Sequence, residues 1–260
     1  SRFMSATDAN GRTYIAHPDG STEIDDAAAS SPLPLMRLPR LRGPPSCGLS
    51  HCVAVTAALE AISWATHKRD GGRYGQLGCV GAGSASAESY EVRRVAMSAE
   101  AAPIAVAAAG DQHSAFVDAD GAVWACGLDR WTQLGQPALW SKGAVWHKTP
   151  RKVAALDGTR IVDVDCGSDH TIALDEQRRV WAWGRGEHGQ LFGPENRPFT
   201  AQPTVSRVLS GDGAAAIVAR GDCSCAASAA AGGLRCVGRC DERRMQLALA
   251  QKRSRPLVKF

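Results

Sequence analysis

Two short motifs in this sequence hold residue types that could do chemistry. Gly184-Arg185-Gly186-Glu187-His188-Gly189 has the G-x-G-x-x-G spacing of a dinucleotide site, which needs a helix to open at the last glycine. Pro194 and Pro198 follow too closely for that helix. Ser168-Asp169-His170 holds the letters of a nucleophilic triad, but neighbours on a strand point to opposite faces. We therefore expect no catalytic residue, no cofactor and no enzyme.

The cysteines raise the question of a metal site. Cys223-x-Cys225 and Cys236-x-x-x-Cys240 could supply zinc ligands, but neither has the usual Cys-x-x-Cys spacing. Cys236 also stands where other copies of a repeat hold small residues. The interpretation as small core residues is favoured, so no metal is expected. Nine cysteines, an odd number, argue against a complete disulfide framework and for a reducing compartment.

A repeated unit supplies the elements that position the histidines. It begins at a glycine with histidine three residues on: Gly48 and His51, Gly110 and His113, Gly167 and His170. A worn fourth copy, aligned at Gly221, has Ser224 in the histidine position. A neutral histidine that fixes a turn through hydrogen bonds to the backbone is favoured over a ring of metal ligands.

Each copy continues as a hairpin. Alternate residues after the glycine are apolar in most copies, and a turn and a second strand follow. The second strands carry tryptophans that we interpret as packing residues: Trp64, Trp124, Trp181 and Trp183. Each copy then has a Gln-Leu pair, beginning at Gln76, Gln133, Gln190 and Gln246. About four short strands in every roughly 55 residues are typical of a propeller blade.

The unit resembles the repeat of the regulator of chromosome condensation family, most closely between Cys166 and Leu191. The resemblance implies an all-β propeller, usually of seven blades, and, for the founding member, guanine-nucleotide exchange on a Ran-type small GTPase. The 260 residues suffice for four to five blades, so we expect an incomplete or open propeller. We divide one domain, 1–260, into a partial blade at 5–26, an irregular segment at 27–46, and blades at about 47–100, 101–160, 161–213 and 214–260.

Composition places the chain among globular proteins, with 44% hydrophobic and 22% charged residues. No apolar run approaches the roughly 18 residues of a membrane span. The net charge is +4, and the C-terminal end is basic. We predict partner contacts by loop tryptophans and by this basic end: Trp131, Trp140, Trp146, Arg239, Arg243, Arg244, Lys252, Arg253 and Arg255.

The favoured function is a noncatalytic scaffold or interaction subunit of a larger, organellar protein assembly. An open propeller leaves strand edges unpaired, and we expect another chain to cover them. Two alternatives are guanine-nucleotide exchange on a Ran-type small GTPase and an RNA-contacting role in an organellar ribosome through the basic end. The start at Ser1, the mild basicity and the expected free thiols suggest the mitochondrion, with nucleus, cilium and cytosol as alternatives.

Overall fold

The computed structural model describes most of the chain, and side chains are described from Leu38 onward. The described residues are 4–7, 13–16, 21–25, 36–66, 72–79, 92–136, 145–193, 198–206, 213–228 and 233–253. Residues 251 and 253 are described as helical backbone only.

The described strands form five antiparallel sheets, which follow one another along the chain. The first contains β1 (Met4–Thr7), β2 (Thr13–Ala16), β3 (Ser21–Asp25) and β4 (Met36–Arg37). The second contains β5 (Ser46–Cys47), β6 (His51–Val55), β7 (Ala61–Ala65) and β8 (Arg93–Arg94). The third contains β9 (Ile104–Ala109), β10 (His113–Asp118), β11 (Val123–Leu128) and β12 (Trp146–Lys152), followed by the short 3-10 helix Ala154–Leu156. The fourth contains β13 (Ile161–Cys166), β14 (His170–Asp175), β15 (Val180–Arg185) and β16 (Phe199–Val205). The fifth contains β17 (Ala214–Arg220), β18 (Cys223–Ser228) and β19 (Leu234–Gly238).

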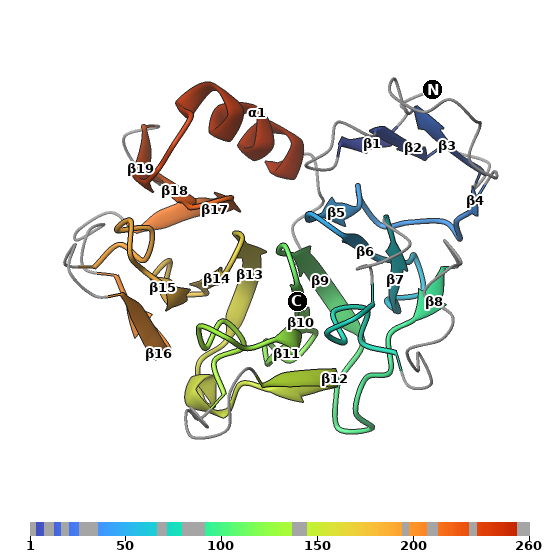
Figure 1. Cartoon of the computed structure of the whole chain (residues 1–260), viewed down its shortest axis with the longest axis horizontal. Coiled ribbons are helices and arrows are strands. Elements are labelled where there is room, and N and C mark those ends of the chain that lie inside the picture. The colour runs from blue at the N-terminus through green and yellow to red at the C-terminus, as the bar shows by residue number, and fades with distance from the viewer. Residues whose placement is uncertain are drawn as a thin grey trace.

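The sheets are arranged around a common hub as the blades of a β-propeller (Figure 1). The strands β9, β13 and β17 line the hub, since β9 contacts β13 and β13 contacts β17. We call the four blades that begin at β5, β9, β13 and β17 the β5, β9, β13 and β17 blades. The all-β propeller expected from the repeat is therefore confirmed.

Each blade packs flat against the next because alternate residues of its second strand face opposite neighbours. Val53 and Val55 of β6 pack in one cluster with Phe116 of β10. On the other face of β10, Ala115 and Val117 pack with residues of the β13 blade. Every residue of β10 and β14 is buried, whereas the outer strand β12 is largely exposed.

Two expected boundaries differ from the structure. The segment 27–46, expected to be irregular, contributes β4 and begins β5. The last blade has three strands among the described residues, and the helix α1 (Glu242–Arg253) follows in place of a fourth strand. The expected Gln-Leu turn at Gln246 lies within this helix. Gln246-Leu247 has the same two residue types as the repeat, but it belongs to a helical segment rich in good helix formers.

Helix α1 covers the face of the β17 blade that another blade would otherwise cover. Met245 and Leu249 are buried against Val218, Cys225 and Ala227, while Leu247 is exposed on the opposite side. In Figure 1 the helix lies between the last sheet and the β1–β4 sheet. Helix α1 thus covers this face of the last blade, whereas the cover of unpaired strand edges by another chain stays a prediction. No helix in the described ranges has the length and apolar character needed to cross a membrane.

Candidate functional site

The repeat histidines tie successive blades together through hydroxyl groups. His51 Nε2 lies 2.7 Å from Ser114 Oγ of the next blade, and that hydroxyl donates to the Gln76 carbonyl at 2.7 Å. His113 Nε2 lies 3.0 Å from Thr171 Oγ1, which donates to the Gln133 carbonyl at 2.8 Å. Because each hydroxyl gives its proton to a carbonyl, Nε2 is the donor to the hydroxyl. The expected histidine bond to the backbone is wrong: these rings reach the backbone through a hydroxyl of the next blade.

His170 makes the third tie, with Nε2 2.7 Å from Ser224 Oγ of the β17 blade. All three rings are fully buried, and their Nδ1 atoms have no hydrogen-bond partner in the part of the chain described. Burial lowers the pKa of His51 and His113 to about 3 and that of His170 to about 4. The histidines are therefore neutral at physiological pH.

Gly110 and Gly167, three residues before their histidines, make room for the rings, whereas Gly48 is confined by the backbone of Gly110. A Cβ on Gly167 would lie against Cε1 of His170 and 2.5 Å from its Nδ1, and would also lie 2.6 Å from the Gly221 carbonyl. A Cβ on Gly110 would meet His113 in the same way and the Gly167 carbonyl at 2.5 Å. The glycine and the histidine are thus one unit, shaped by the ring and by the next blade.

The last blade is shifted by one residue from the alignment at Gly221. Cys223 pairs with Gly238 as His113 pairs with Gly127, and the Arg239 amide donates to the Asp222 carbonyl as the Leu128 amide does to that of Gln112. Cys223 therefore takes the histidine position, and Ser224 takes the hydroxyl position. The hairpin is one residue longer, which hid this register from sequence inspection.

The cysteine in the histidine position explains why the last blade has an arginine where other blades have glycine. Arg220 takes the place of Gly110 and Gly167, because Arg220 pairs with Cys223 and the next pair matches those blades. Without a histidine ring, a side chain fits at this position. Arg220 Nη1 lies 3.5 Å from Asp165 Oδ1.

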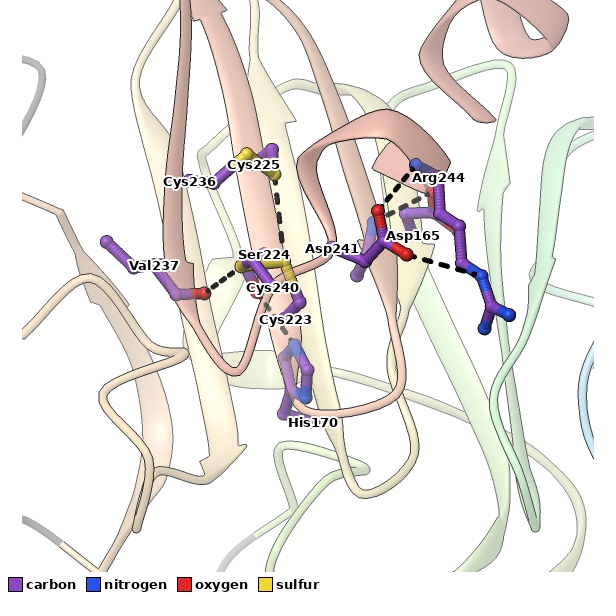
Figure 2. Close-up of a disulfide and its surroundings, with 11 residues drawn as sticks. Asp165, His170, Cys223, Ser224, Cys225, Cys236, Val237, Cys240, Asp241 and Arg244 are labelled. Carbon is purple, nitrogen blue, oxygen red and sulfur yellow. Dashed lines mark hydrogen bonds and ion pairs between the residues drawn. A yellow bond between two sulfur atoms is a disulfide. The ribbon is translucent and has the colours of Figure 1, made fainter. Parts of the chain in front are cut away.

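Four sulfurs gather where the last blade meets the segment leading to α1 (Figure 2). Disulfides join Cys223 to Cys240 and Cys225 to Cys236. All four sulfurs lie within 4.8 Å of one another, and Cys223 Sγ and Cys225 Sγ are 3.7 Å apart. These are the four cysteines that the sequence analysis considered as zinc ligands and then interpreted as small core residues. Their spacing does not show the strand register that brings Cys236 opposite Cys225.

The disulfides correct the expectation drawn from an odd cysteine count. Cys47 and Cys52 form a third bridge between β5 and β6, while Cys79, Cys126 and Cys166 are buried free thiols. Burial raises the pKa of all three thiols. An odd total is therefore compatible with three bridges, and the thiol argument for a reducing compartment loses its basis.

One end of the propeller, the loop end, gathers charged groups and an aromatic side chain. We define it by Asp111, Asp169, Asp222, Trp131, Arg130, Arg185 and His188. Arg185 Nη1 lies 3.6 Å from Asp169, and His188 Nε2 lies 3.5 Å from Asp222. The guanidinium groups of Arg130 and Arg185 lie 5.4 and 5.3 Å from the Trp131 ring centroid. Burial and then repulsion from neighbouring carboxylates raise the pKa of Asp169, whereas Arg185 opposes that rise.

The other predicted contact residues divide into three groups. Trp146 on β12 is 47% exposed, and Arg239, Arg243 and Arg244 are exposed near the start of α1. Lys252 is wrong as a surface contact, because its Nζ lies 2.9 Å from Asp163 and 3.4 Å from Asp165, in a side chain only 10% exposed. Trp140, the side chain of Arg253, and Arg255 lie outside the described residues.

The tryptophans of the hairpins lie inside the blades. Trp64, Trp124 and Trp183 are buried and Trp181 is partly buried. Trp124 and Trp181 donate from Nε1 to Asp118 and Asp175 at 2.8 and 2.9 Å. The repeat Gln76 and Gln133 accept from the amides two residues earlier, which closes the loop after each third strand. These groups stabilise blades and do not line a reaction site.

The arrangement lends itself poorly to catalysis. The Ser114–His51 pair has nucleophile-to-base distance, but both groups are 0% exposed and the hydroxyl proton is already given to a carbonyl. A histidine with a pKa of about 3 is also a weak general base at neutral pH. At Gly184–Gly189 a turn follows β15, with no helix through residue 193 to receive a pyrophosphate. The loop end is the better candidate for a functional surface.

The structure places this protein in the class of β-propellers, with buried histidines that link neighbouring blades. The family model described as the regulator of chromosome condensation (RCC1) repeat matches residues 120–174, and a second model of the same description matches 104–130 and 161–190. Residues 104–190 therefore carry regulator of chromosome condensation repeats, which confirms the resemblance predicted from the sequence.

Relatives of known name share these repeats. Human E3 ubiquitin-protein ligase HERC2 is 32% identical over 146 residues, which cover 55% of this chain and 3% of that protein. The Arabidopsis thaliana ultraviolet-B receptor UVR8 is 30% identical over 173 residues, 65% of this chain and 35% of the receptor. The chain thus spans about a third or less of these relatives.

Solved structures share the fold. Human WBSCR16 superposes with a TM-score of 0.66 at 20% identity, covering 88% of this chain and 60% of that one. Prp20p from Saccharomyces cerevisiae gives 0.66 at 18% identity, covering 93% and 57%. The chain covers less than two thirds of either structure.

Proposed function

We propose that this protein is a noncatalytic scaffold or interaction subunit of a larger protein assembly, and that its loop end binds a protein partner. The observation that carries the proposal is that two sets of polar groups lie in different places. The repeat histidines are buried in ties between blades, whereas Trp131, Arg130 and Arg185 form a cation–aromatic cluster at the loop end. Tryptophan and arginine are the residues most enriched among strong contributors to protein interfaces.

The charge pattern at the loop end indicates the chemistry of the partner. Asp111, Asp169 and Asp222 lie in the loops that follow the hub strands β9, β13 and β17, and Arg130 and Arg185 lie around Trp131. A partner with a basic residue facing the hub and an apolar or acidic residue facing Trp131 would complement both parts. Opposed charges of this kind set orientation and association rate more than affinity.

Site-specific photo-crosslinking in cells tests this proposal. A photoreactive residue at position 131 should give one discrete adduct, and the same residue at Glu176, exposed in the β14–β15 turn, should not. Arg185→Ala should weaken binding of the identified partner at least about tenfold. Migration of the extracted protein as a free monomer, with no adduct at either position, would overturn the proposal.

A second candidate is guanine-nucleotide exchange on a Ran-type small GTPase. The observation in its favour is the fold shared with Prp20p, whose described binding partners are Gsp1p and histones. Nucleotide release from a panel of small GTPases distinguishes the two candidates. Release stimulated by substoichiometric protein would replace the scaffold proposal with the exchange proposal.

An RNA-contacting role in an organellar ribosome is the third candidate. Arg239, Arg243 and Arg244 are exposed together and could face phosphates, although Lys252 is engaged with Asp163 and Asp165. Binding through phosphates must weaken steeply as salt rises. Binding to RNA that is indifferent to salt, or absent, removes this candidate.

The proposed compartment is the mitochondrion. Its support is the mild net charge of +4. Fluorescence imaging of the tagged full-length protein beside a mitochondrial marker tests it, and a nuclear, ciliary or cytosolic signal would contradict it.

A further inference from the structure

We propose that Cys223, Cys225, Cys236 and Cys240, in their reduced form, bind one Zn²⁺ ion as a tetrathiolate. The two disulfides are then the oxidised form of the same site. This inference is independent of the proposed scaffold function, because it concerns how the last blade is fastened to α1.

The geometry already approaches that of a zinc site. Tetrahedral Zn–S bonds of about 2.3 Å place neighbouring sulfurs about 3.8 Å apart. The non-bonded Cys223 and Cys225 sulfurs are 3.7 Å apart, and all four sulfurs lie within 4.8 Å of one another. Four thiolates in one small volume favour zinc among the common protein metals, and they leave no open coordination position.

The backbone holds the four cysteines in place from three segments (Figure 2). Cys223 and Cys225 are two apart on β18, so their side chains share the face that α1 covers. Cys236 lies directly opposite Cys225 on β19. Cys240 follows β19 and precedes α1, and its sulfur lies 3.1 Å from the Val237 carbonyl. A bound ion would therefore join both strands to the start of the helix.

The surroundings suit a site of net negative charge. One Zn²⁺ with four thiolates carries a charge of −2. The segment around the last two ligands has four arginines, at 235, 239, 243 and 244, against two acids, Asp241 and Glu242. Helix α1 begins two residues after Cys240, so its positive N-terminal end adds to this field. Asp241 caps that end, with Oδ1 accepting from the Arg244 amide at 3.2 Å, and this holds Cys240 at the blade.

Access and reactivity separate this cluster from the other cysteines. Cys223 and Cys225 are buried, but Cys236 and Cys240 are partly exposed, which opens a path for metal and reductant. Cys126 and Cys166 are fully buried, and burial raises their thiol pKa. Those thiols stay protonated and do not compete for zinc.

The conversion balances with a dithiol as the reductant. Two dithiol molecules each give two electrons and two protons, break one of the two disulfides, and close to cyclic disulfides. The four resulting thiols release four protons as Zn²⁺ binds. Oxidation of the thiolates by two equivalents of a two-electron oxidant reforms both disulfides and frees the ion.

Zinc binding by the full chain, reduced with a dithiol under nitrogen and then freed of it, tests this proposal. Titration with Zn²⁺ alone should reach one ion per chain. Co²⁺ in place of zinc should give the charge-transfer and intense visible bands of a tetrahedral tetrathiolate. Cys236→Ser with Cys240→Ser should abolish both signals. The matched pair Cys47→Ser with Cys52→Ser removes a disulfide elsewhere and should leave both unchanged.

Three results would overturn the proposal. One is a reduced wild-type chain that binds less than about a tenth of an equivalent of zinc. Another is a cobalt spectrum of nitrogen or oxygen coordination, and the third is equal loss of zinc in both double variants. The cobalt spectrum needs no variant, so misfolding of a serine variant leaves the test intact.

Discussion

Each junction between blades from β5 onward is tied by a neutral histidine, whereas the junction between the last blade and α1 is tied by sulfur. His113 donates to Thr171 across one junction, and Cys223, at the same position of the last blade, bonds Cys240. The difference lies in the element that each blade packs against. A neighbouring blade offers a hydroxyl at a fixed register, while a helix offers none. The same position of the repeat thus holds either a histidine that hydrogen-bonds to the next blade or a cysteine that forms a disulfide.

The buried histidines also explain why two of the repeat positions before them hold glycine. Gly167 is confined by the His170 ring and by the next hub loop, whereas Arg220 in the last blade carries a full side chain at the same position. Glycine and histidine therefore change together where the next blade is replaced by a helix. This coupling can be broken at several points.

Lowering the pH should reduce the stability of the fold more than any single substitution, because all three buried histidines disfavour protonation. Their folded-state pKa of about 3 to 4 lies below the unfolded value of about 6.5, so the unfolded chain binds protons first as pH falls. The stability contributed by these histidines should be constant above pH 7 and decline from about pH 6.5 downward, and the pKa of about 6 at Asp129, raised by burial, offsets part of the decline. The loss is roughly 2 kcal/mol per histidine at pH 5. Urea unfolding at pH 8, 7 and 5 measures it, and equal midpoints at all three would contradict the buried neutral state.

The glycine–histidine coupling predicts the next largest effect. Gly167→Ala places a methyl group against the His170 ring and should destabilise the fold by about 3 kcal/mol. Gly193→Ala is the matched control, because nothing lies within 4 Å of its added methyl.

A second substitution tests the cause of that loss. Adding His170→Cys to Gly167→Ala reproduces the pairing of a larger residue with cysteine seen in the last blade. The double variant should be less destabilised than the sum of the two single variants. Recovery is partial, since the Gly221 carbonyl still lies 2.6 Å from the methyl position. Additive losses in thermal unfolding would show that glycine and histidine act separately.

The helix junction predicts a contrast within one helix. Leu249 is 7% exposed against the β17 blade and Leu247 is 67% exposed. Leu249→Ala should cost about 2 to 3 kcal/mol, and Leu247→Ala less than about 0.5 kcal/mol. Denaturant unfolding compares them. Equal small effects would mean that α1 contributes little to the stability of the last blade.

The sequence predicted the hairpins and the propeller because their period and order recur several times. His113 and His170 were recognised as structural, but their partners could not be read, since Ser114 and Thr171 belong to the next blade. The sequence aligns the last copy at Gly221, but the position that matches Gly110 and Gly167 holds Arg220. Nothing local shows that a longer hairpin shifts Cys223 into the histidine position.

The pairing of the four clustered cysteines and the helix were not predicted, for related reasons. Cys236 meets Cys225 only through the β18–β19 register, which spacing rules do not contain. Gln246-Leu247 matched the repeat in letters, and its helical setting depends on the burial of Met245 and Leu249 against the blade. Local sequence patterns therefore predict the repeated blades well, but they do not predict the last blade and helix α1.

The smallest expected effect comes from breaking one tie without changing its shape. Thr171→Val keeps the volume but removes the hydroxyl, which leaves the His113 donor and the Gln133 carbonyl without this partner in a buried junction. The expected loss is about 2 kcal/mol. Thr204→Val on the exposed strand β16 is the control and should be near neutral, because its hydroxyl bond lies at the surface. Because Ser224 holds the same place opposite His170, Ser224→Ala should cost a similar amount if the shifted register is right. Thermal unfolding of the three variants measures this, and a neutral Ser224→Ala beside a costly Thr171→Val would separate the last junction from the others.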